Sequence, residues 1–257
     1  MTLESPSSSR FPVILLPGIV LPAELAYGAL IAALDADVEA LAKDLEVYAT
    51  EEPPDDYGLE LEIAGVLREA DARGWERFHV VGYSGGGAVS LGLAAASPER
   101  LASLALLEPA WAGSWDQSPA EKAVWLELHR LEDLPADRFV ASFMRLGLRP
   151  GVPLPTPPPG EPPPWMAKRP AGIRSIMRAF GRGDIDREAL RRFDRPVYFA
   201  LGALSNPDHY EEIAKRLSTV FQDFALEVFE ERHHFDPPHR IEPERVARSL
   251  DRLWRRA

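Results

Sequence analysis

The chain of 257 residues contains no cysteine. This absence excludes disulfide bonds, thiolate metal sites and a cysteine nucleophile, and it fits a reducing compartment. Long apolar runs are also missing, because three prolines and a glycine interrupt the apolar stretch 11–26. A membrane-spanning helix is therefore not expected there. The first ten residues lack the cationic start, apolar run and cleavage site of an export signal, so we expect a cytoplasmic protein.

Basic residues are in the minority, with 29 Lys and Arg against 40 Asp and Glu, for a formal charge of −11. Such a surface repels phosphate backbones and anionic lipid headgroups. Hydrophobic residues make up 46% of the chain and charged residues 27%, the usual balance of a globular chain that buries a core. We therefore expect a small-molecule substrate, with neither nucleic acid nor membrane as a partner.

Short apolar runs alternate with amphipathic stretches along most of the chain. Runs that are apolar on both faces are typical of a parallel sheet covered by helices on both sides. The alternation thus predicts an α/β architecture with right-handed crossovers. The expected strands are 12–16, 45–49, 78–81, 101–107, 196–201 and 225–229. The expected helices are 23–34, 59–73, 87–96, 207–217 and 243–254.

The alternation is interrupted once, between residues 111 and 193. Amphipathic segments at 119–131 and 135–146 lie there without a convincing strand. We therefore predict a helical insertion at 111–193 between two core segments, 1–110 and 194–257. Within the insertion, residues 149–165 hold nine prolines in seventeen residues, a density that excludes helix and sheet and predicts a loop.

A glycine-flanked serine is the most informative feature. Ser84 stands in the pattern Gly-x-Ser-x-Gly between Gly82 and Gly86, after an apolar strand and before a helix. In this pattern the serine occupies a strained turn and acts as a nucleophile, and the glycines avoid collisions across the bend. The N–H of Gly85, at the helix N-terminus, is suited to stabilise an oxyanion.

A second oxyanion donor is expected from the turn after the first strand, Leu-Pro-Gly at 16–18. We assign this donor to the N–H of Ile19, with Val20 as a near alternative. A serine hydroxyl also needs a general base, for which histidine is the natural candidate.

The serine motif, the 16–18 turn and the pair His234-Phe235 resemble the α/β-hydrolase superfamily over nearly the whole chain. The resemblance implies an α/β-hydrolase fold: a mostly parallel sheet of about six strands flanked by helices, with the insertion as a cap over the active site. It also implies that His234 is the base, because it precedes a Glu-Pro-Glu segment and the last helix. His233 stands where the family often has glycine, which keeps it as an alternative.

The acid of the expected triad has two candidates. Ser205 occupies the place where the family usually has its aspartate. Asp208 lies three residues later, while Glu108 directly follows the apolar run 101–107. Some members of the superfamily carry the acid after the strand that follows the serine, so we favour Glu108 and keep Asp208 as the alternative. The role of the acid is to orient the imidazole of the base and to stabilise the imidazolium.

The sequence thus predicts a serine hydrolase without cofactor or metal that cleaves an ester-like bond of a small, apolar substrate through an acyl-enzyme. Carboxylesters, thioesters and lactones all fit. The alternatives are a carbon–carbon bond hydrolase or lyase on the same scaffold and a non-catalytic ligand-binding protein. A dinucleotide-binding oxidoreductase fits less well: Gly82, Gly85 and Gly87 with Glu108 imitate its fingerprint, but Ser84 and His234 would then have no role.

Overall fold

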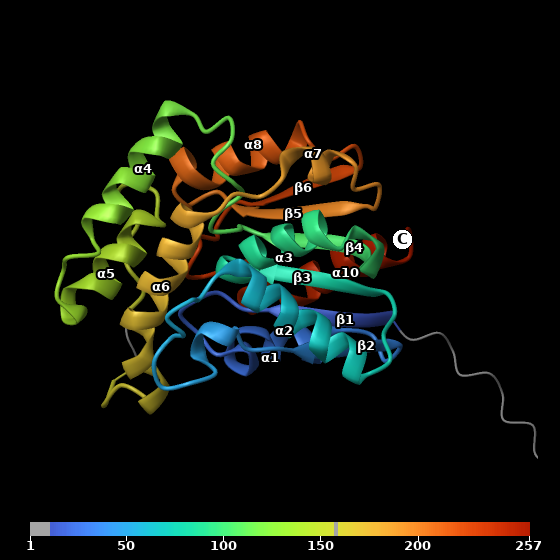
Figure 1. The fold of residues 1–257 in the computed structure, drawn as a ribbon, viewed down its shortest axis with the longest axis horizontal. Coiled ribbons are helices and arrows are strands. Elements are labelled where there is room, and N and C mark those ends of the chain that lie inside the picture. Colours follow the sequence, from blue (N-terminus) through green and yellow to red (C-terminus); the bar gives the residue numbers. More distant parts are fainter. Residues whose placement is uncertain (1–10, 157–158) are drawn as a thin grey trace, which may run out of the picture.

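The computed structural model describes residues 11–156 and 159–257. The segment 1–10, where no export signal is predicted, and two residues of the proline-rich loop lie outside this range. Six parallel strands form one sheet, which confirms the predicted parallel sheet of about six strands; their order is β2-β1-β3-β4-β5-β6 (Figure 1). The strands are β1 (Phe11–Leu16), β2 (Val38–Ala42), β3 (Phe78–Tyr83), β4 (Leu101–Leu107), β5 (Val197–Gly202) and β6 (Phe224–Phe229).

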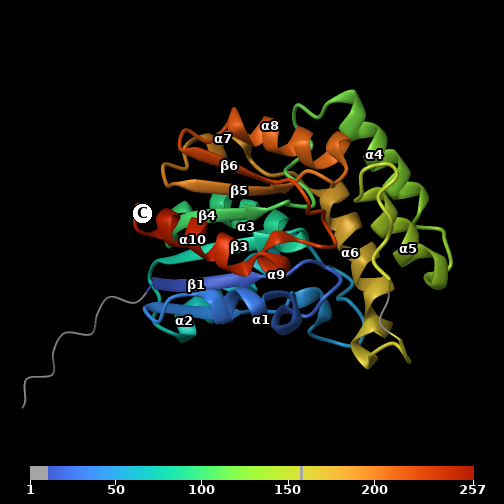
Figure 2. The ribbon, with the colours of Figure 1, turned by 180° about the vertical axis from the view of Figure 1, so that it is seen from behind.

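Helices cover both faces of the sheet, because successive strand residues are buried on opposite sides. In β1, Ile14 and Leu16 belong to one apolar cluster, and Val13 and Leu15 to the other. The first cluster is covered by α2 (Leu59–Ala72), α3 (Gly85–Ala96), α7 (Arg187–Arg191) and α8 (Glu212–Ser218), which face the viewer in Figure 1. The second is covered by α1 (Ala23–Ala33), α9 (Pro238–Ile241) and α10 (Pro243–Trp254), seen in Figure 2.

The predicted strand at 45–49 is wrong. The second strand is β2, and the later segment forms a short 3₁₀ turn, η1 (Glu46–Tyr48). The backbone N–H groups of Glu46 and Val47 donate to the buried carboxylate of Glu62 in α2, at 2.8 and 3.0 Å. These donors are therefore unavailable to a sheet ladder. As an edge strand that includes the exposed Glu39, β2 lacks the continuous apolar run of the inner strands.

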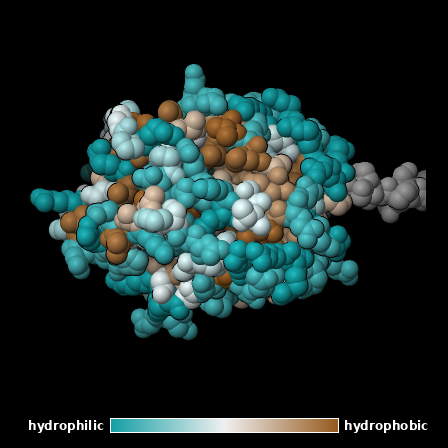
Figure 3. Space-filling model, turned by 90° about the horizontal axis from the view of Figure 1, so that it is seen from above, coloured by the Kyte–Doolittle hydropathy of each residue, from teal (hydrophilic) through white to brown (hydrophobic). Residues whose placement is uncertain are grey.

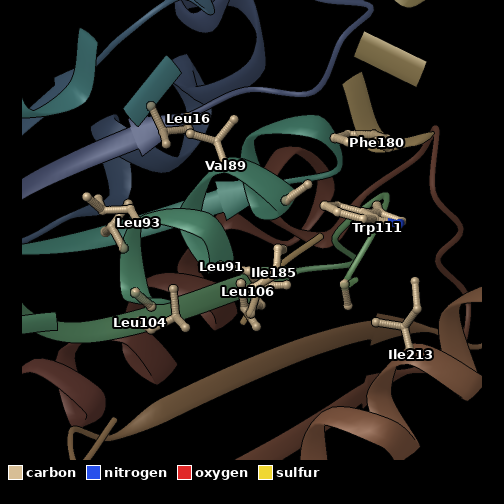
Figure 4. Packing of buried hydrophobic residues seen from close by; sticks show 14 of the residues in the cluster. Leu16, Val89, Leu91, Leu93, Leu104, Leu106, Trp111, Phe180, Ile185 and Ile213 are labelled. Atoms are coloured by element: carbon tan, nitrogen blue, oxygen red, sulfur yellow. The ribbon is translucent and has the colours of Figure 1, made fainter. Parts of the chain in front are cut away.

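Between β4 and β5 the chain forms α4 (Pro119–Arg130), α5 (Ala136–Leu146), η3 (Pro164–Lys168), α6 (Arg169–Arg182) and α7. No strand occurs in the described part of this insertion. Helices α4, α5 and α6 lie beside the carboxyl ends of the strands (Figures 1 and 2). Trp111 and Phe180 stack at 5.1 Å between ring centroids and join α6 to the core (Figure 4). The insertion is thus placed over the edge where β3 and β4 end.

The remaining short turns are η2 (Pro98–Arg100) and η4 (Pro207–Glu211). The predicted helix 207–217 is divided between η4, a π-helical turn, and α8.

The surface on the side of α8 and β6 is largely hydrophilic and carries an apolar patch (Figure 3). Leu226 and Val228 of the edge strand β6 are exposed. Among the helices described here, none has the length and apolar character needed to cross a membrane.

Candidate active site

Ser84 occupies the sharp turn between β3 and α3. Its backbone angles, φ 53° and ψ −117°, lie in a region that residues other than glycine rarely adopt. Two hydrogen bonds hold this conformation: the Ser84 N–H donates to the Leu107 carbonyl at 3.1 Å, and the Ala110 N–H donates to the Ser84 carbonyl at 2.8 Å. The end of β4 therefore fixes the strained turn.

The glycines on either side of Ser84 are required by close packing. A Cβ atom on Gly82 would collide with the Gly86 carbonyl, and one on Gly86 would collide with the Leu16 carbonyl. In the dinucleotide interpretation, Gly85 and Gly87 would leave room for a pyrophosphate. Instead they pack against the side chain of Ile19 and against Pro109. The glycine pattern is thus explained by the turn itself.

Three side chains that are distant in sequence meet at this turn. The Ser84 Oγ lies 2.9 Å from Nε2 of His234, and Nδ1 of His234 lies 3.0 Å from Oε2 of Glu108. Each of the three residues is at most 3% exposed. Because a carboxylate only accepts, Nδ1 carries the proton and donates to Glu108, which leaves Nε2 free to accept from the serine hydroxyl. This is the arrangement that activates a serine nucleophile.

Of the two acid candidates, the structure brings Glu108 to the imidazole. Its second oxygen, Oε1, accepts the Gly202 N–H at 2.7 Å, so that both oxygens of this buried carboxylate are bonded. Asp208 is exposed, and its N–H caps the turn by donating to the Asn206 side chain. Ser205, at the usual place of the acid, is buried, and its Oγ has no partner among the described residues.

Two tyrosines that the sequence analysis did not single out position His234. The Tyr83 hydroxyl donates to the His234 carbonyl, and the Tyr210 ring stacks on the imidazole at 4.4 Å. Burial raises the pKa of both tyrosines well above its ordinary value, and the charge of Glu108 raises it further. Both therefore stay neutral. Tyr83 lies inside the serine motif, which could have drawn attention to it; Tyr210 has no comparable signal.

His233, the alternative base, has a different place. Its Nδ1 accepts the N–H groups of Phe235 and Asp236 at 3.2 and 3.0 Å. Burial lowers its pKa, which favours the neutral acceptor form that this turn requires. His233 therefore shapes the loop that presents His234, and it is His234 that contacts Ser84.

The expected oxyanion donors lie beside Ser84. In the first turn of α3, the Gly86 N–H donates to the Pro17 carbonyl, and those of Gly87 and Ala88 donate to the Ser84 carbonyl. Within the described ranges, the Gly85 N–H has no such partner and stays available at the helix N-terminus. Ile19 lines the same cavity as Ser84, and its carbonyl accepts the Tyr48 hydroxyl at 2.6 Å, whereas Val20 is not among the lining residues.

A small, largely apolar cavity lies over Ser84. Its volume is about 30 Å³, room for one or two waters, whereas pockets for drug-sized ligands span about 300–1,000 Å³. Helices α4, α5 and α6 supply much of the lining, so the insertion forms a large part of the cavity wall. The lining residues are Ile19, Ser84, Ala110, Val124, Trp125, Leu128, Phe143, Leu146, Gly147, Met177, Phe180, His209, Tyr210 and Phe235.

Similarity to known proteins agrees with this geometry. A sequence model of the alpha/beta hydrolase family matches residues 13–249, while no curated protein matches the chain. An esterase from Exiguobacterium antarcticum superposes with a TM-score of 0.73 at 16% identity, covering 96% of this chain and 92% of the other. For a hydrolase from Pseudomonas aeruginosa the values are 0.68, 20%, 96% and 91%.

A meta-cleavage product hydrolase from Pseudomonas fluorescens has a TM-score of 0.63 at 18% identity, with coverage of 95% and 90%. At these identities the solved structures support the fold. The family model spans nearly the whole chain and includes the serine turn and the histidine loop. The chain therefore belongs to the alpha/beta hydrolase family.

Proposed function

We propose that this hydrolase cleaves an ester-like bond of a small, apolar substrate through an acyl-enzyme, without a cofactor. Carboxylesters, thioesters and lactones share the required carbonyl chemistry. The observation that carries the proposal is the continuous hydrogen-bonded chain from the Ser84 hydroxyl through His234 to the buried Glu108. The largely apolar lining of the cavity supports an apolar substrate. The sequence features favour action in the cytoplasm.

In the proposed reaction, Ser84 Oγ attacks the substrate carbonyl while His234 Nε2 takes the hydroxyl proton. Glu108 accepts the Nδ1–H throughout and stabilises the imidazolium. The N–H groups of Gly85 and Ile19 stabilise the oxyanion, and the imidazolium then returns its proton to the leaving group. Water, activated by the same imidazole, releases the acyl group and regenerates the Ser84 hydroxyl. We propose the insertion 111–193 as the cap that excludes bulk water during these steps.

A carbon–carbon bond hydrolase is a second candidate, because the fold is shared with a meta-cleavage product hydrolase. The same serine and oxyanion donors suit attack on a ketone carbonyl. Parallel assays with esters and with 1,3- and 1,5-diketones distinguish the two. We expect esters to be turned over faster than diketones. If only diketones were turned over, the carbon–carbon bond hydrolase would be the better assignment and the ester proposal would be wrong.

The test of the nucleophile is Ser84→Ala. We expect kcat/KM for p-nitrophenyl esters to fall by a factor of about 10⁴ or more, together with loss of stoichiometric labelling by a fluorophosphonate. Ser205→Ala is the matched control, because it removes another buried serine hydroxyl that has no bond to His234. Full turnover by Ser84→Ala would refute the mechanism. Ligand binding by a wild-type protein that resists labelling would favour the non-catalytic alternative.

A further inference from the structure

Two residues that line the cavity over Ser84 each carry an unpaired polar atom. They are His209 and Trp125. His209 Nδ1 and Trp125 Nε1 are buried, and neither has a hydrogen-bond partner in the part of the chain that the structure describes. Buried polar atoms without partners are rare in native proteins, because burial removes their hydrogen bonds to water without replacing them. Two of them in one substrate cavity call for a ligand that pairs with both.

The hydrogen-bonding role of each atom is fixed by its surroundings. His209 Nε2 lies 3.0 Å from the Ala110 carbonyl, which only accepts, so Nε2 carries the proton. Burial lowers the pKa of His209 to about 3, and the ring is therefore neutral, with an acceptor lone pair at Nδ1. The indole N–H of Trp125 only donates. The cavity thus offers one acceptor and one donor.

The pair is close together and close to the nucleophile. The rings of Trp125 and His209 meet edge to face, with 5.8 Å between their centroids. Ala110, which accepts from His209, donates its own N–H to the Ser84 carbonyl. A second ring contact, to Tyr210 at 4.7 Å, fixes the plane of His209 next to the residue that stacks on His234. The pair therefore belongs to the same rigid framework as the serine turn.

We propose that His209 Nδ1 and Trp125 Nε1 form a polar subsite that binds a hydroxyl or amide group of the substrate. A hydroxyl donates to His209 and accepts from Trp125 with the same oxygen; an amide uses its N–H and its carbonyl. The proposal rests on the proposed function and makes it more specific: the substrate is an ester-like compound whose apolar body carries one neutral hydrogen-bonding group away from the reacting carbonyl. An all-hydrocarbon chain leaves both atoms unpaired.

The kinetic test compares p-nitrophenyl esters of ω-hydroxy acids with esters in which a methyl group replaces the hydroxyl, over a range of chain lengths. At the length that reaches the subsite, we expect the hydroxyl to raise kcat/KM by about 10- to 100-fold, because the analogue leaves buried groups unpaired. His209→Phe and Trp125→Phe should each reduce this preference toward 1 while the methyl ester is still hydrolysed.

Trp115→Phe is the matched control. Its indole N–H is likewise buried without a partner among the described residues, but Trp115 does not line the cavity. We expect this variant to keep the full preference. Thermal unfolding of all three variants checks that each is folded. A preference that survives both cavity variants would overturn the proposal, as would the absence of a preference both here and in the binding measurement below.

A binding measurement separates this inference from the proposed reaction. The Ser84→Ala variant is titrated calorimetrically with ethyl esters of the same hydroxy and methyl acids, and with acetate esters that carry the hydroxyl on the alcohol side. The hydroxyl ligand should bind about 10-fold or more tightly, and His209→Phe should remove the difference. If the preference is present and Ser84 proves dispensable for turnover, the reaction mechanism fails and the subsite stands. If no ligand shows a preference, the subsite fails even when Ser84 is essential.

Discussion

At the scale of single residues, the site depends on two strained backbone conformations. Ser84 and Glu108 both have positive φ, 53° and 48°, an arrangement that costs of order 1–3 kcal/mol for each residue other than glycine. The two residues are bridged at the backbone, because the Ser84 N–H donates to Leu107, the neighbour of Glu108. The strain at Ser84 and at Glu108 is therefore maintained by the same junction between β3 and β4.

Glu108→Gln tests the acid. A glutamine still accepts the Gly202 N–H but carries no charge to stabilise the imidazolium of His234. We expect kcat/KM for an activated ester to fall by about 10³- to 10⁴-fold, with the protein still folded. Asp208→Asn is the matched control, since Asp208 is exposed and has no bond to His234; its activity should stay near that of the wild type. Steady-state kinetics of both variants decide, and the reverse order would move the acid to Asp208.

At the scale of elements, the insertion forms much of the wall of the cavity over Ser84. The cavity of about 30 Å³ is smaller than the pockets that usually hold drug-sized ligands, so we propose that α4, α5 and α6 shift, or their side chains repack, when substrate binds. Met177 of α6 is 2% exposed and forms part of the lining. Met177 is on the buried side of α6 and is one of the apolar residues that limit the cavity.

Met177→Ala should enlarge the cavity and shift the preferred acyl chain to longer esters in a p-nitrophenyl panel. The truncation should also lower the free energy of unfolding by about 2–5 kcal/mol. Leu190→Ala, in α7, is the matched control, because Leu190 is fully buried and does not line the cavity. It should lower stability similarly and leave the chain preference unchanged. An unchanged preference in Met177→Ala would contradict the assignment of α6 as a wall of the substrate site.

The elements also show which parts of the fold could be predicted from the sequence. Inner strands such as β5 are buried on both faces and read as continuous apolar runs. The contact between Ser84 and His234 was predictable because a local motif and the order along the chain single out both residues. The edge strand β2 was missed because it lacks a continuous apolar run. The segment 45–49 was wrongly predicted as a strand, because the contacts of Glu46 and Val47 with the Glu62 carboxylate depend on a helix elsewhere in the chain. To choose Glu108 over Asp208 as the carboxylate that pairs with His234, the position at which β4 ends had to be known.

At the scale of the whole molecule, burial of neutral histidines links stability to pH. Burial lowers the pKa of His79 to about 4 and those of His209 and His239 to about 3. Between these values and the ordinary pKa near 6.5, the unfolded chain binds protons that the folded protein excludes. The free energy of unfolding therefore falls as the pH decreases through this window, and the contribution of these groups is complete above about pH 7.

His239 gives the clearest test of this linkage. It is fully buried between Tyr27 and Tyr83, and within residues 11–156 and 159–257 neither ring nitrogen has a partner. His239→Phe removes the titrating group and preserves a planar ring. Between pH 7.5 and 5, the wild type should lose about 2 kcal/mol more stability than this variant, from 1.36 kcal/mol per pKa unit over about 1.5 units.

Urea unfolding at the two pH values measures this difference, and comparison between variants cancels the contributions of carboxylates common to both. His129→Phe, at an exposed position of α4, is the matched control and should keep the pH dependence of the wild type. The sign follows from burial: a histidine that must stay neutral to fold makes acid destabilising, so its removal flattens the curve. A steeper curve for His239→Phe would mean that the folded protein holds this imidazole in its charged form.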